Sequence, residues 1–270
     1  MCVTCGCSDH VPEVAPHDHH PLHSPSSHSH PPSSHSHPPS SHSHSHSHSH
    51  SSEPDPRRVR LEHDILSRNA HIAAHNRAFF DARGLFALNV VSSPGSGKTT
   101  LLERTIVDTA GRLTISVLQG DQETDHDAVR IRRAGAKSVQ INTGKGCHLD
   151  ASMVARAVTE LDPAPGSTLV IENVGNLVCP ALFDLGEHAR VAVLSVTEGT
   201  DKPLKYPYLF RGSHVVLINK IDLAKYVDFD IDACVDYVRR VNPDAVIHTV
   251  SAKTGEGLDR FYAYLMEGRS

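Results

Sequence analysis

Apolar residues along this chain follow two alternating patterns. Short continuous runs rich in Val, Ile and Leu are typical of strands buried on both faces, and longer runs with apolar residues every three or four positions are typical of helices. This alternation predicts an α/β fold with a mostly parallel sheet and helices on both of its faces. We expect strands at residues 86–91, 113–118, 138–142, 168–171, 191–196, 215–218 and 245–250. We expect helices at residues 57–82, 97–109, 124–134, 150–161, 231–241 and 257–267, the first with Leu61, Ile65, Ile72 and Phe79 on roughly one face.

The first fifth of the chain lacks both patterns. Residues 10–50 are almost only His, Ser and Pro, with too little apolar surface to offset the entropy lost on ordering, so we expect them to be disordered. Pro54 and Pro56 mark a stiff boundary after them. We therefore divide the chain into a cysteine motif at residues 1–9, a His-rich arm at 10–56 and one domain at 57–270 that begins with a helix.

Charge and composition exclude several classes of protein. The formal net charge is −5 with neutral histidines, and no Lys/Arg-rich block is present, which argues against a nucleic-acid binder. No apolar stretch approaches the roughly 18 residues of a membrane span, and the N-terminus lacks the pattern of a signal peptide. We expect a cytoplasmic protein, in which the six cysteines are reduced and metal ligation is a better explanation for them than disulfides.

The turn between the first expected strand and the next helix reads Ser-Ser-Pro-Gly-Ser-Gly-Lys-Thr from Ser92 to Thr99. Its backbone N–H groups and the following helix N-terminus are expected to surround a phosphate, with Lys98 reaching the β- and γ-phosphates and the Thr99 hydroxyl ligating Mg²⁺. The usual phosphate-loop pattern has glycine where this chain has Ser92. A simple glycine-rich turn is the alternative, but it needs no Lys-Thr after the last glycine. The expected nucleotide-binding residues here are Gly95, Ser96, Gly97, Lys98, Thr99 and Thr100.

Two later segments indicate guanine as the base. Asn219, Lys220 and Asp222 form Asn-Lys-x-Asp after an expected strand, and a carboxylate at Asp222 can accept hydrogen bonds from the guanine N1–H and amine, which adenine cannot supply. Asn219 supports the base edge and loop, and the Lys220 stem lies on the ring face. Ser251-Ala252-Lys253 matches the Ser-Ala-Lys loop whose backbone N–H meets guanine O6. Either segment alone could be an exposed turn, but the pair after a phosphate loop predicts GTP and GDP as ligands.

Carboxylates at strand ends are the candidates for Mg²⁺ and catalysis. Mg²⁺ prefers one or two carboxylates together with phosphate oxygens and water, so Asp121, Glu172 and Thr99 suffice. We assign Lys98, Asp121 and Glu172 as the catalytic residues. Glu172 stands where GTPases usually carry Asp-x-x-Gly, and Gly175 is expected to sense the γ-phosphate.

The acidic residues that follow Asp121 have a structural explanation. Residues 124–127 resemble a helix N-cap followed by acidic first-turn residues. We therefore leave Asp125 and Asp127 out of the site and keep Glu123 as a further candidate. No Gln stands at an obvious water-positioning place, so we expect slow GTP hydrolysis, which fits a switch better than a motor.

The N-terminal segment carries soft and borderline metal ligands. Cys2, Cys5 and Cys7 form Cys-x-x-Cys-Gly-Cys, whose thiolates suit Zn²⁺, Cu(I) or Ni²⁺. A redox Cys-x-x-Cys lacks its βαβ setting here. Residues 10–50 hold fourteen of the 22 histidines, many two positions apart, which in an extended chain puts imidazoles about 6.5 to 7 Å apart on one side. We interpret this tract as a metal reservoir. A purification tag is the alternative, but the tract is internal and interrupted by Pro.

Three residues inside the domain form a second candidate metal site. Cys147 and His148 follow an expected strand, and Cys179 lies shortly beyond Gly175 in the loop that should move with the γ-phosphate. If they meet on one Ni²⁺ or Zn²⁺ ion, metal occupancy and nucleotide state are mechanically linked. Two unrelated loop thiols are the alternative. Cys234 follows an amphipathic helical pattern and is expected in the core.

The combination of these motifs resembles the HypB family, the nickel-insertion GTPases of [NiFe]-hydrogenase maturation, over essentially the whole chain. The resemblance rests on Met-Cys-x-x-Cys-Gly-Cys, the His-rich insert, the phosphate loop with Ser92, Gly-Cys-His-Leu-Asp, Glu-Asn-Val-Gly-Asn-Leu-Val-Cys-Pro and Asn-Lys-Ile-Asp. It implies a SIMIBI-like P-loop G domain and a GTP-promoted homodimer with Cys147, His148 and Cys179 near its interface. It also implies Ni²⁺ transfer with a small zinc-containing chaperone of the HypA type to the hydrogenase large subunit.

Two other functions stay open at this point. The urease accessory GTPase is similar in fold and His-rich at its start, but its Cys-Pro-His metal motif is absent here and it lacks Cys-x-x-Cys-Gly-Cys. The chain could also be mainly a nickel buffer whose GTPase domain is incidental. A buffer binds metal independently of nucleotide, whereas a nickel-insertion protein does not.

Overall fold

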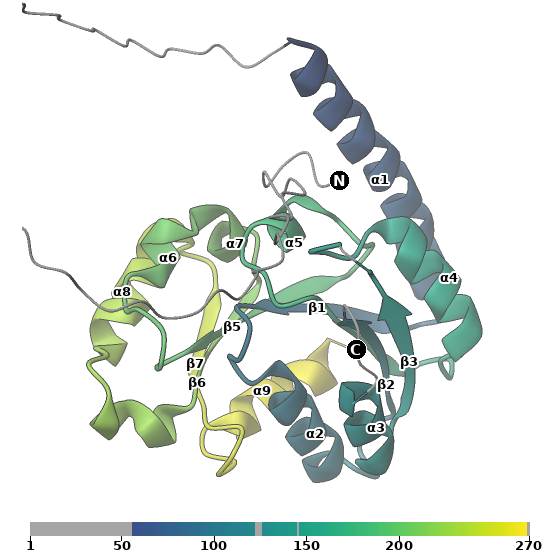
Figure 1. Cartoon of the computed structure of the whole chain (residues 1–270). Helices are drawn as coiled ribbons and strands as arrows, with labels where there is room; N and C mark the ends of the chain where they lie inside the picture. The colour runs from purple at the N-terminus through teal and green to yellow at the C-terminus, as the bar shows by residue number, and fades with distance from the viewer. Residues whose placement is uncertain (1–55, 122–125, 145, 269–270) are drawn as a thin grey trace, which may run out of the picture.

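The computed structural model of this protein describes residues 56–121, 126–144 and 146–268. The N-terminal cysteine motif, the His-rich arm with its expected disorder, and the candidates Glu123 and Asp125 lie outside the described residues. Figure 1 shows the described part as a twisted sheet with helices on both sides.

The sheet has seven strands, all parallel, in the order β3-β2-β4-β1-β5-β6-β7. Each strand lies where the sequence predicts one, so the prediction of an α/β fold with a parallel sheet is confirmed. Strands β1, β4 and β5 are almost wholly buried, which explains their continuous apolar runs. The strand bounds are β1 Phe86–Ser92, β2 Ile115–Asp121, β3 Lys137–Asn142, β4 Thr168–Glu172, β5 Ala189–Ser195, β6 Val215–Asn219 and β7 Val246–Thr249.

Helices cover both faces of this sheet (Figure 1). On one face α2, α3 and α9 pack on the apolar side chains of β1, β2, β4, β5 and β6. On the other face α1 and α4 cover one half, and α7 and α8 cover the other. The six long helices agree with the sequence prediction, and they are α1 Pro56–Ala82, α2 Lys98–Asp108, α3 His126–Arg133, α4 Ala151–Leu161, α8 Ile231–Val241 and α9 Leu258–Glu267. Not predicted are α5 Cys179–Leu182, α6 Lys202–Lys205, α7 Pro207–Arg211 and the 3₁₀ helix η1 Ile221–Tyr226.

Helix α1 packs through a different face from its apolar stripe. Leu61, Ile65 and Phe79 are 50%, 41% and 38% exposed, and the buried ridge is instead Asn69, Ala73, Asn76 and Phe80. The two asparagines hydrogen-bond to backbone groups of α4 and of the segment before β5. Polar anchoring by the two asparagines, which apolar spacing does not reveal, therefore contributes to docking beside the buried Ala73 and Phe80.

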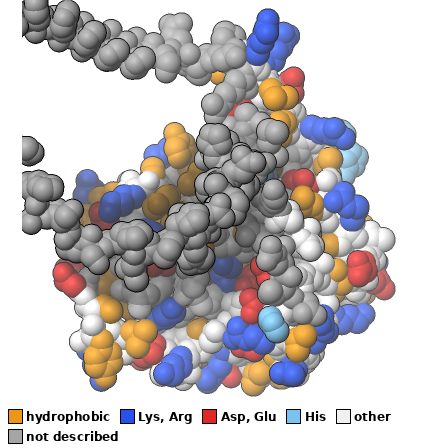
Figure 2. All heavy atoms as spheres, viewed as in Figure 1, with side chains coloured by type: hydrophobic (Ala, Val, Ile, Leu, Met, Phe, Trp, Pro, Cys, Tyr) orange, Lys and Arg blue, Asp and Glu red, His pale blue; other side chains and the backbone are white. Residues whose placement is uncertain are grey.

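The surface of the described part mixes charges of both signs. Figure 2 shows basic and acidic side chains interspersed on the visible face, with apolar side chains between them. None of the helices described is long and apolar enough to cross a membrane.

The register of the sheet brings the sequence motifs to one edge. Val90 of β1 and Gln119 of β2 both lie opposite Glu172 of β4, and Ser195 of β5 lies opposite Asn219 of β6. Because the strands are parallel, their carboxyl ends meet along this edge, where α/β sheets bind ligands.

Candidate functional site

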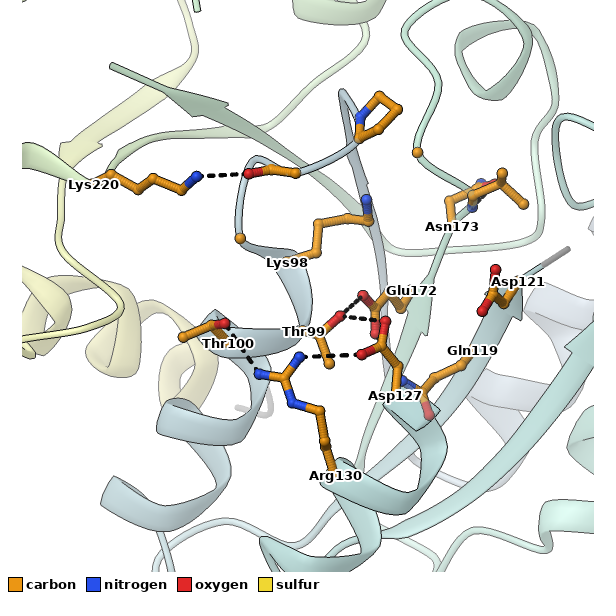
Figure 3. Close-up of a pocket in the computed structure, with 16 residues that line it drawn as sticks. Lys98, Thr99, Thr100, Gln119, Asp121, Asp127, Arg130, Glu172, Asn173 and Lys220 are labelled. Atoms are coloured by element: carbon orange, nitrogen blue, oxygen red, sulfur yellow. Dashed lines mark hydrogen bonds and ion pairs between the residues drawn. The ribbon is translucent and has the colours of Figure 1, made fainter. Parts of the chain in front are cut away.

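A cavity of about 550 Å³ opens at the carboxyl edge of the sheet, over the turn between β1 and α2 (Figure 3). The cavity is lined by residues of this turn, of the ends of β2 and β4, and of the start of α3. It is lined by Pro94, Gly95, Gly97, Lys98, Thr99, Thr100, Gln119, Gly120, Asp121, Asp127, Arg130, Glu172, Asn173, Val174, Gly175 and Lys220.

The turn between β1 and α2 has the backbone of a phosphate loop. Gly97 precedes α2 with φ 99°, and a Cβ there would lie 2.7 Å from Asn219 Nδ2, so only glycine fits. Lys98 Nζ donates to Ser92 Oγ at 2.8 Å, and Ser96 Oγ donates to the same oxygen at 2.6 Å. Ser92, the departure from the usual pattern, thus holds Lys98 in place. Burial lowers the pKa of the Lys98 ammonium, although the carboxylates of Glu172 and Asp127 oppose this.

Oxygen ligands gather around Thr99 at the bottom of the cavity. Thr99 Oγ1 lies within hydrogen-bond distance of two carboxylates, 2.7 Å from Glu172 Oε1 and 3.1 Å from Asp127 Oδ2, as Figure 3 shows. Gln119 Nε2 donates to Glu172 Oε2 at 3.0 Å. Burial raises the pKa of Glu172 although Lys98 opposes this. A hydroxyl and two carboxylates are the hard donors that Mg²⁺ prefers, so the residues present fit this ion. Asp121 lines the same cavity.

Two residues of α3 belong to the cavity although the sequence does not assign them. The exclusion of Asp127 is wrong, because its carboxylate reaches Thr99 while the residue also occupies the first turn of α3. Arg130, one turn later, donates to Asp127 Oδ1 at 3.1 Å and to Thr100 Oγ1 at 3.2 Å. In a sequence, an acidic residue in the first turn of a helix looks the same whether or not it lines a cavity. Only the tertiary structure distinguishes the two roles.

The segments expected to bind the base are hydrogen-bonded to the phosphate loop. Asn219 Nδ2 donates to the Ser96 carbonyl at 2.9 Å, and Lys220 Nζ donates to the Gly95 carbonyl at 2.7 Å. Asn219 Oδ1 accepts from the Ala252 N–H at 3.0 Å. The two contacts with the phosphate loop join residues more than 120 positions apart.

Asp222 and the Ser-Ala-Lys segment lie beside the cavity and do not line it. Ser251 Oγ donates to Asp222 Oδ1 at 2.6 Å, which orients the carboxylate. Ala252 and Lys253 line a second hollow that shares Thr100 and Arg130 with the first. Hydrogen bonds therefore connect the 251–252 segment with Asp222 and, through Asn219, with the phosphate loop.

Cys147, His148 and Cys179 come together in one cluster. Their ligand atoms all lie within 4.8 Å of one another, with Cys147 Sγ 3.0 Å from Cys179 Sγ and 3.7 Å from His148 Nδ1. The His148 ring stacks on Phe183, and burial lowers its pKa, which favours the neutral, metal-binding imidazole. Two thiols and one imidazole suit Ni²⁺ or Zn²⁺.

Cys234 is buried among apolar side chains of α8 and β6, so its expected place in the core is confirmed.

Asn173 connects this cluster with the cavity. It lines the cavity, is 1% exposed and follows Glu172. Its Oδ1 accepts from the Leu149 N–H, directly after His148, at 3.3 Å, and from the Val174 N–H at 3.0 Å. Its Nδ2 donates to Asn89 Oδ1 at 3.2 Å.

A buried polar network continues from Asn89 to the segment that carries Cys179. Asn89 Nδ2 donates to Glu187 Oε1 at 3.1 Å, and Arg190 donates to the same oxygen at 3.0 Å. Arg190 also donates to the Ala181 carbonyl in α5, the helix that begins at Cys179. The sequence contained one signal for this network, because Asn89 interrupts the apolar run of β1.

Gly175 forms a second contact between the two sites. A Cβ at this position would lie 2.9 Å from Pro94 Cα in the phosphate loop. Four residues later the chain reaches Cys179. The phosphate loop is therefore in close contact with the segment that leads to one thiol of the cluster.

Comparisons with known proteins find similar sequences and structures among nucleotide-binding proteins. Residues 86–249 match the family model described as "CobW/HypB/UreG, nucleotide-binding domain". The Hydrogenase maturation factor HypB of Rhizobium leguminosarum bv. viciae is 60% identical over 207 residues, which span 77% of this chain and 69% of the relative.

Two solved structures are similar to the described fold. The hydrogenase maturation factor HypB of Archaeoglobus fulgidus is 39% identical with a TM-score of 0.71, over 76% of this chain and all of that one. HypB of Helicobacter pylori, solved in complex with nickel, is 38% identical with a TM-score of 0.70, over 75% of this chain and 95% of that one. The phosphate loop, the thiol and imidazole cluster and these likenesses together show that the chain belongs to the HypB family of hydrogenase maturation factors, within the CobW/HypB/UreG nucleotide-binding proteins.

Proposed function

We propose that this protein is a GTP-hydrolysing nickel metallochaperone that delivers Ni²⁺ to the large subunit of [NiFe]-hydrogenase during maturation. The observation that carries the proposal is the hydrogen bond from the Leu149 N–H to Asn173, which links the Cys147, His148 and Cys179 cluster to the cavity. The name and nickel complex of similar proteins support hydrogenase maturation and Ni²⁺ as cargo. Zn²⁺ is a second ion that the same donors accept.

In this proposal the cavity binds the phosphates of GTP. The loop N–H groups and Lys98 hold the β- and γ-phosphates, and Thr99, Glu172, Asp121 and Asp127 provide the oxygen donors for Mg²⁺. Mg²⁺, when bound, neutralises charge on the phosphate oxygens. A cation at this position would favour the charged form of Glu172, whose pKa is raised by burial. Hydrolysis is slow, because Gln119 is hydrogen-bonded to Glu172 and Ser138 and does not orient the attacking water.

Guanine specificity comes from Asp222, Asn219 and the loop at residues 251–253. Ser251 fixes one oxygen of the Asp222 carboxylate, and an adenine would supply no N–H donors to the other oxygen. A polar group that is buried without its partner costs about 1–3 kcal/mol, and more when it is charged. The nucleotide pocket therefore selects GTP and GDP over ATP and ADP.

Nucleotide state controls the cluster through two contacts. The γ-phosphate site lies between the phosphate loop and the segment from Asn173 to Gly175, which touches Pro94. Movement of this segment pulls on Leu149 through Asn173 and on Cys179 along the chain. Loss of the γ-phosphate thereby changes the distance between the two thiols and releases Ni²⁺.

The partners follow from the family. We propose a GTP-promoted homodimer with the cluster near its interface, a small zinc-containing chaperone of the HypA type, and the hydrogenase large subunit as recipient, all in the cytoplasm. The cysteine motif at residues 1–9 binds metal, and the histidines of residues 10–50 form a nickel store. Deletion of residues 10–50 should therefore lower the nickel content of cells without stopping transfer.

The decisive experiment measures Ni²⁺ affinity of the cluster with GDP and with a non-hydrolysable GTP analogue. We would use the full chain with Cys2→Ser, Cys5→Ser and Cys7→Ser, and follow thiolate-to-nickel charge-transfer absorption, which the histidine tract does not produce. We expect a tenfold difference, which corresponds to about 1.4 kcal/mol of coupling. Cys179→Ser should remove the absorption. Equal affinities in the two nucleotide states would contradict the proposal and favour a nickel buffer.

A further inference from the structure

Two histidines on the exposed side of α1 stand together outside the sites described above. His71 and His75 are one helical turn apart, and both are exposed. Their Nε2 atoms lie 3.3 Å from each other, and the ring centroids are 4.7 Å apart with an angle of 85° between the planes. Figure 2 shows histidine side chains on the surface along α1.

This geometry matches two ligands of one metal ion. Imidazole nitrogens bind Zn²⁺ at about 2.0–2.1 Å, so two of them in tetrahedral coordination lie about 3.3 Å from each other. A pair of histidines four positions apart on one helix face is a known arrangement for binding one ion. We propose that His71 and His75 form a bidentate site for a divalent transition-metal ion, with Zn²⁺ or Ni²⁺ as the ligand.

The surroundings restrict which ions this pair can hold. Arg68 lies three positions before His71 and is exposed, so its charge opposes any cation on this face. Binding therefore depends on coordination by nitrogen, which favours Zn²⁺, Ni²⁺ or Cu²⁺ over Mg²⁺ or Ca²⁺. The protein supplies two ligands, and water fills the other positions, which makes this a site of exchange and not of permanent storage.

The pair lies on the part of α1 that anchors the start of α4. Asn69 Oδ1 accepts from the Ala151 N–H at 2.8 Å, and Asn76 Nδ2 donates to the Ala151 carbonyl at 2.8 Å. Ala151 follows His148 by three residues. A metal ion bound by His71 and His75 would bridge the helical turn between Asn69 and Asn76. It would therefore stiffen the part of α1 that supports the start of α4, just after Cys147 and His148.

Peptide-resolved amide hydrogen exchange of the full chain, with Zn²⁺ alone and without nucleotide, tests this site. An ion that bridges the two histidines must leave before this turn opens, so Zn²⁺ at ten times its dissociation constant should slow the exchange of residues 72–79 about tenfold. His75→Ala should remove the effect, and the helix should persist because alanine favours it. The matched control is His63→Ala, on the same helix but with Val59 and Ser67 at the positions four residues away.

The cluster could also stabilise α1 through Ala151, so the experiment is repeated with Cys147→Ser and Cys179→Ser together. We expect the slower exchange to remain in this variant. The proposal is overturned if Zn²⁺ leaves residues 72–79 unchanged, if His75→Ala keeps the protection, or if the two serine substitutions remove it. None of these outcomes depends on GTP, so they are independent of the proposed nickel delivery.

Discussion

In the proposed function, Asp222 is the residue on which the choice of base depends most directly. With Ser251 Oγ at 2.6 Å, one oxygen of its carboxylate is already held in place. We predict that Asp222→Asn weakens GDP binding by about thirtyfold, because a hydrogen bond to a charged group contributes about 1.5–3 kcal/mol. Xanthine carries a carbonyl where guanine has its amine, and the asparagine amide can donate to it, so XDP binding should improve. Titration of both nucleotides checks this.

The control for this prediction is Ser251→Ala, which removes only the group that orients Asp222. It should weaken GDP binding by less and leave the preference for guanine intact. If Asp222→Asn lowered the affinities for GDP and XDP equally, the residue would support the loop and would not read the base.

Single residues differ in how well the sequence predicts them. The phosphate loop, Glu172 and the Cys147, His148 and Cys179 cluster were predictable, since each is part of a short motif at a strand end. Asp127 was not, because its place in the cavity depends on how α3 meets α2 across the edge of the sheet. The partners of Asn173 are also non-local, and no spacing in the sequence encodes them.

At the scale of elements, α1 shows that a helix can dock through asparagines. Asn76 is buried, and its Nδ2 donates to the carbonyls of Ala151 and Leu185 at 2.8 and 3.0 Å. We predict that Asn76→Ala lowers the free energy of unfolding by about 2 kcal/mol, because two buried carbonyls lose their donor. In thermal denaturation this is a fall in Tm of about 4–8 °C for a domain of this size.

Leu61→Ala is the matched control on the same helix. Leu61 belongs to the apolar stripe but is 50% exposed, so we expect its loss to cost less than about 0.5 kcal/mol. The opposite ranking of the two variants would mean that the stripe is covered in solution and that the asparagines are secondary.

The elements that the sequence missed are short. Helices α5, α6 and α7 have four, four and five residues, too few to show helical periodicity. All three have proline in the first turn, where its fixed φ suits a helix start. In a sequence such prolines also occur in loops, so the local pattern does not distinguish a short helix from a loop. The consequence is functional, because α5 begins at Cys179 and so orients that thiol.

At the scale of the whole molecule, the order of the strands is what joins the two sites. The sequence predicts seven strands but not the order β3-β2-β4-β1-β5-β6-β7, because parallel neighbours are chosen by non-local packing. This order puts β4 between β2 and β1, so Asn173 at the end of β4 can reach both Asn89 and Leu149. The coupling between nucleotide and metal that we propose therefore depends on the strand order.

Asn173→Ala tests this coupling directly. We predict that the tenfold effect of the GTP analogue on Ni²⁺ affinity falls towards one, because Leu149 loses its link to the cavity. Since linkage is reciprocal, the effect of Ni²⁺ on affinity for the analogue must shrink by the same factor. Both are measured by titrating each ligand in the absence and presence of the other.

Asn242→Ala is the control, because Asn242 also donates to backbone carbonyls but lies at the end of α8, away from the link between Asn173 and Leu149. If both variants reduced the coupling equally, general destabilisation would explain the loss, and if neither did, the signal would pass through Gly175 alone.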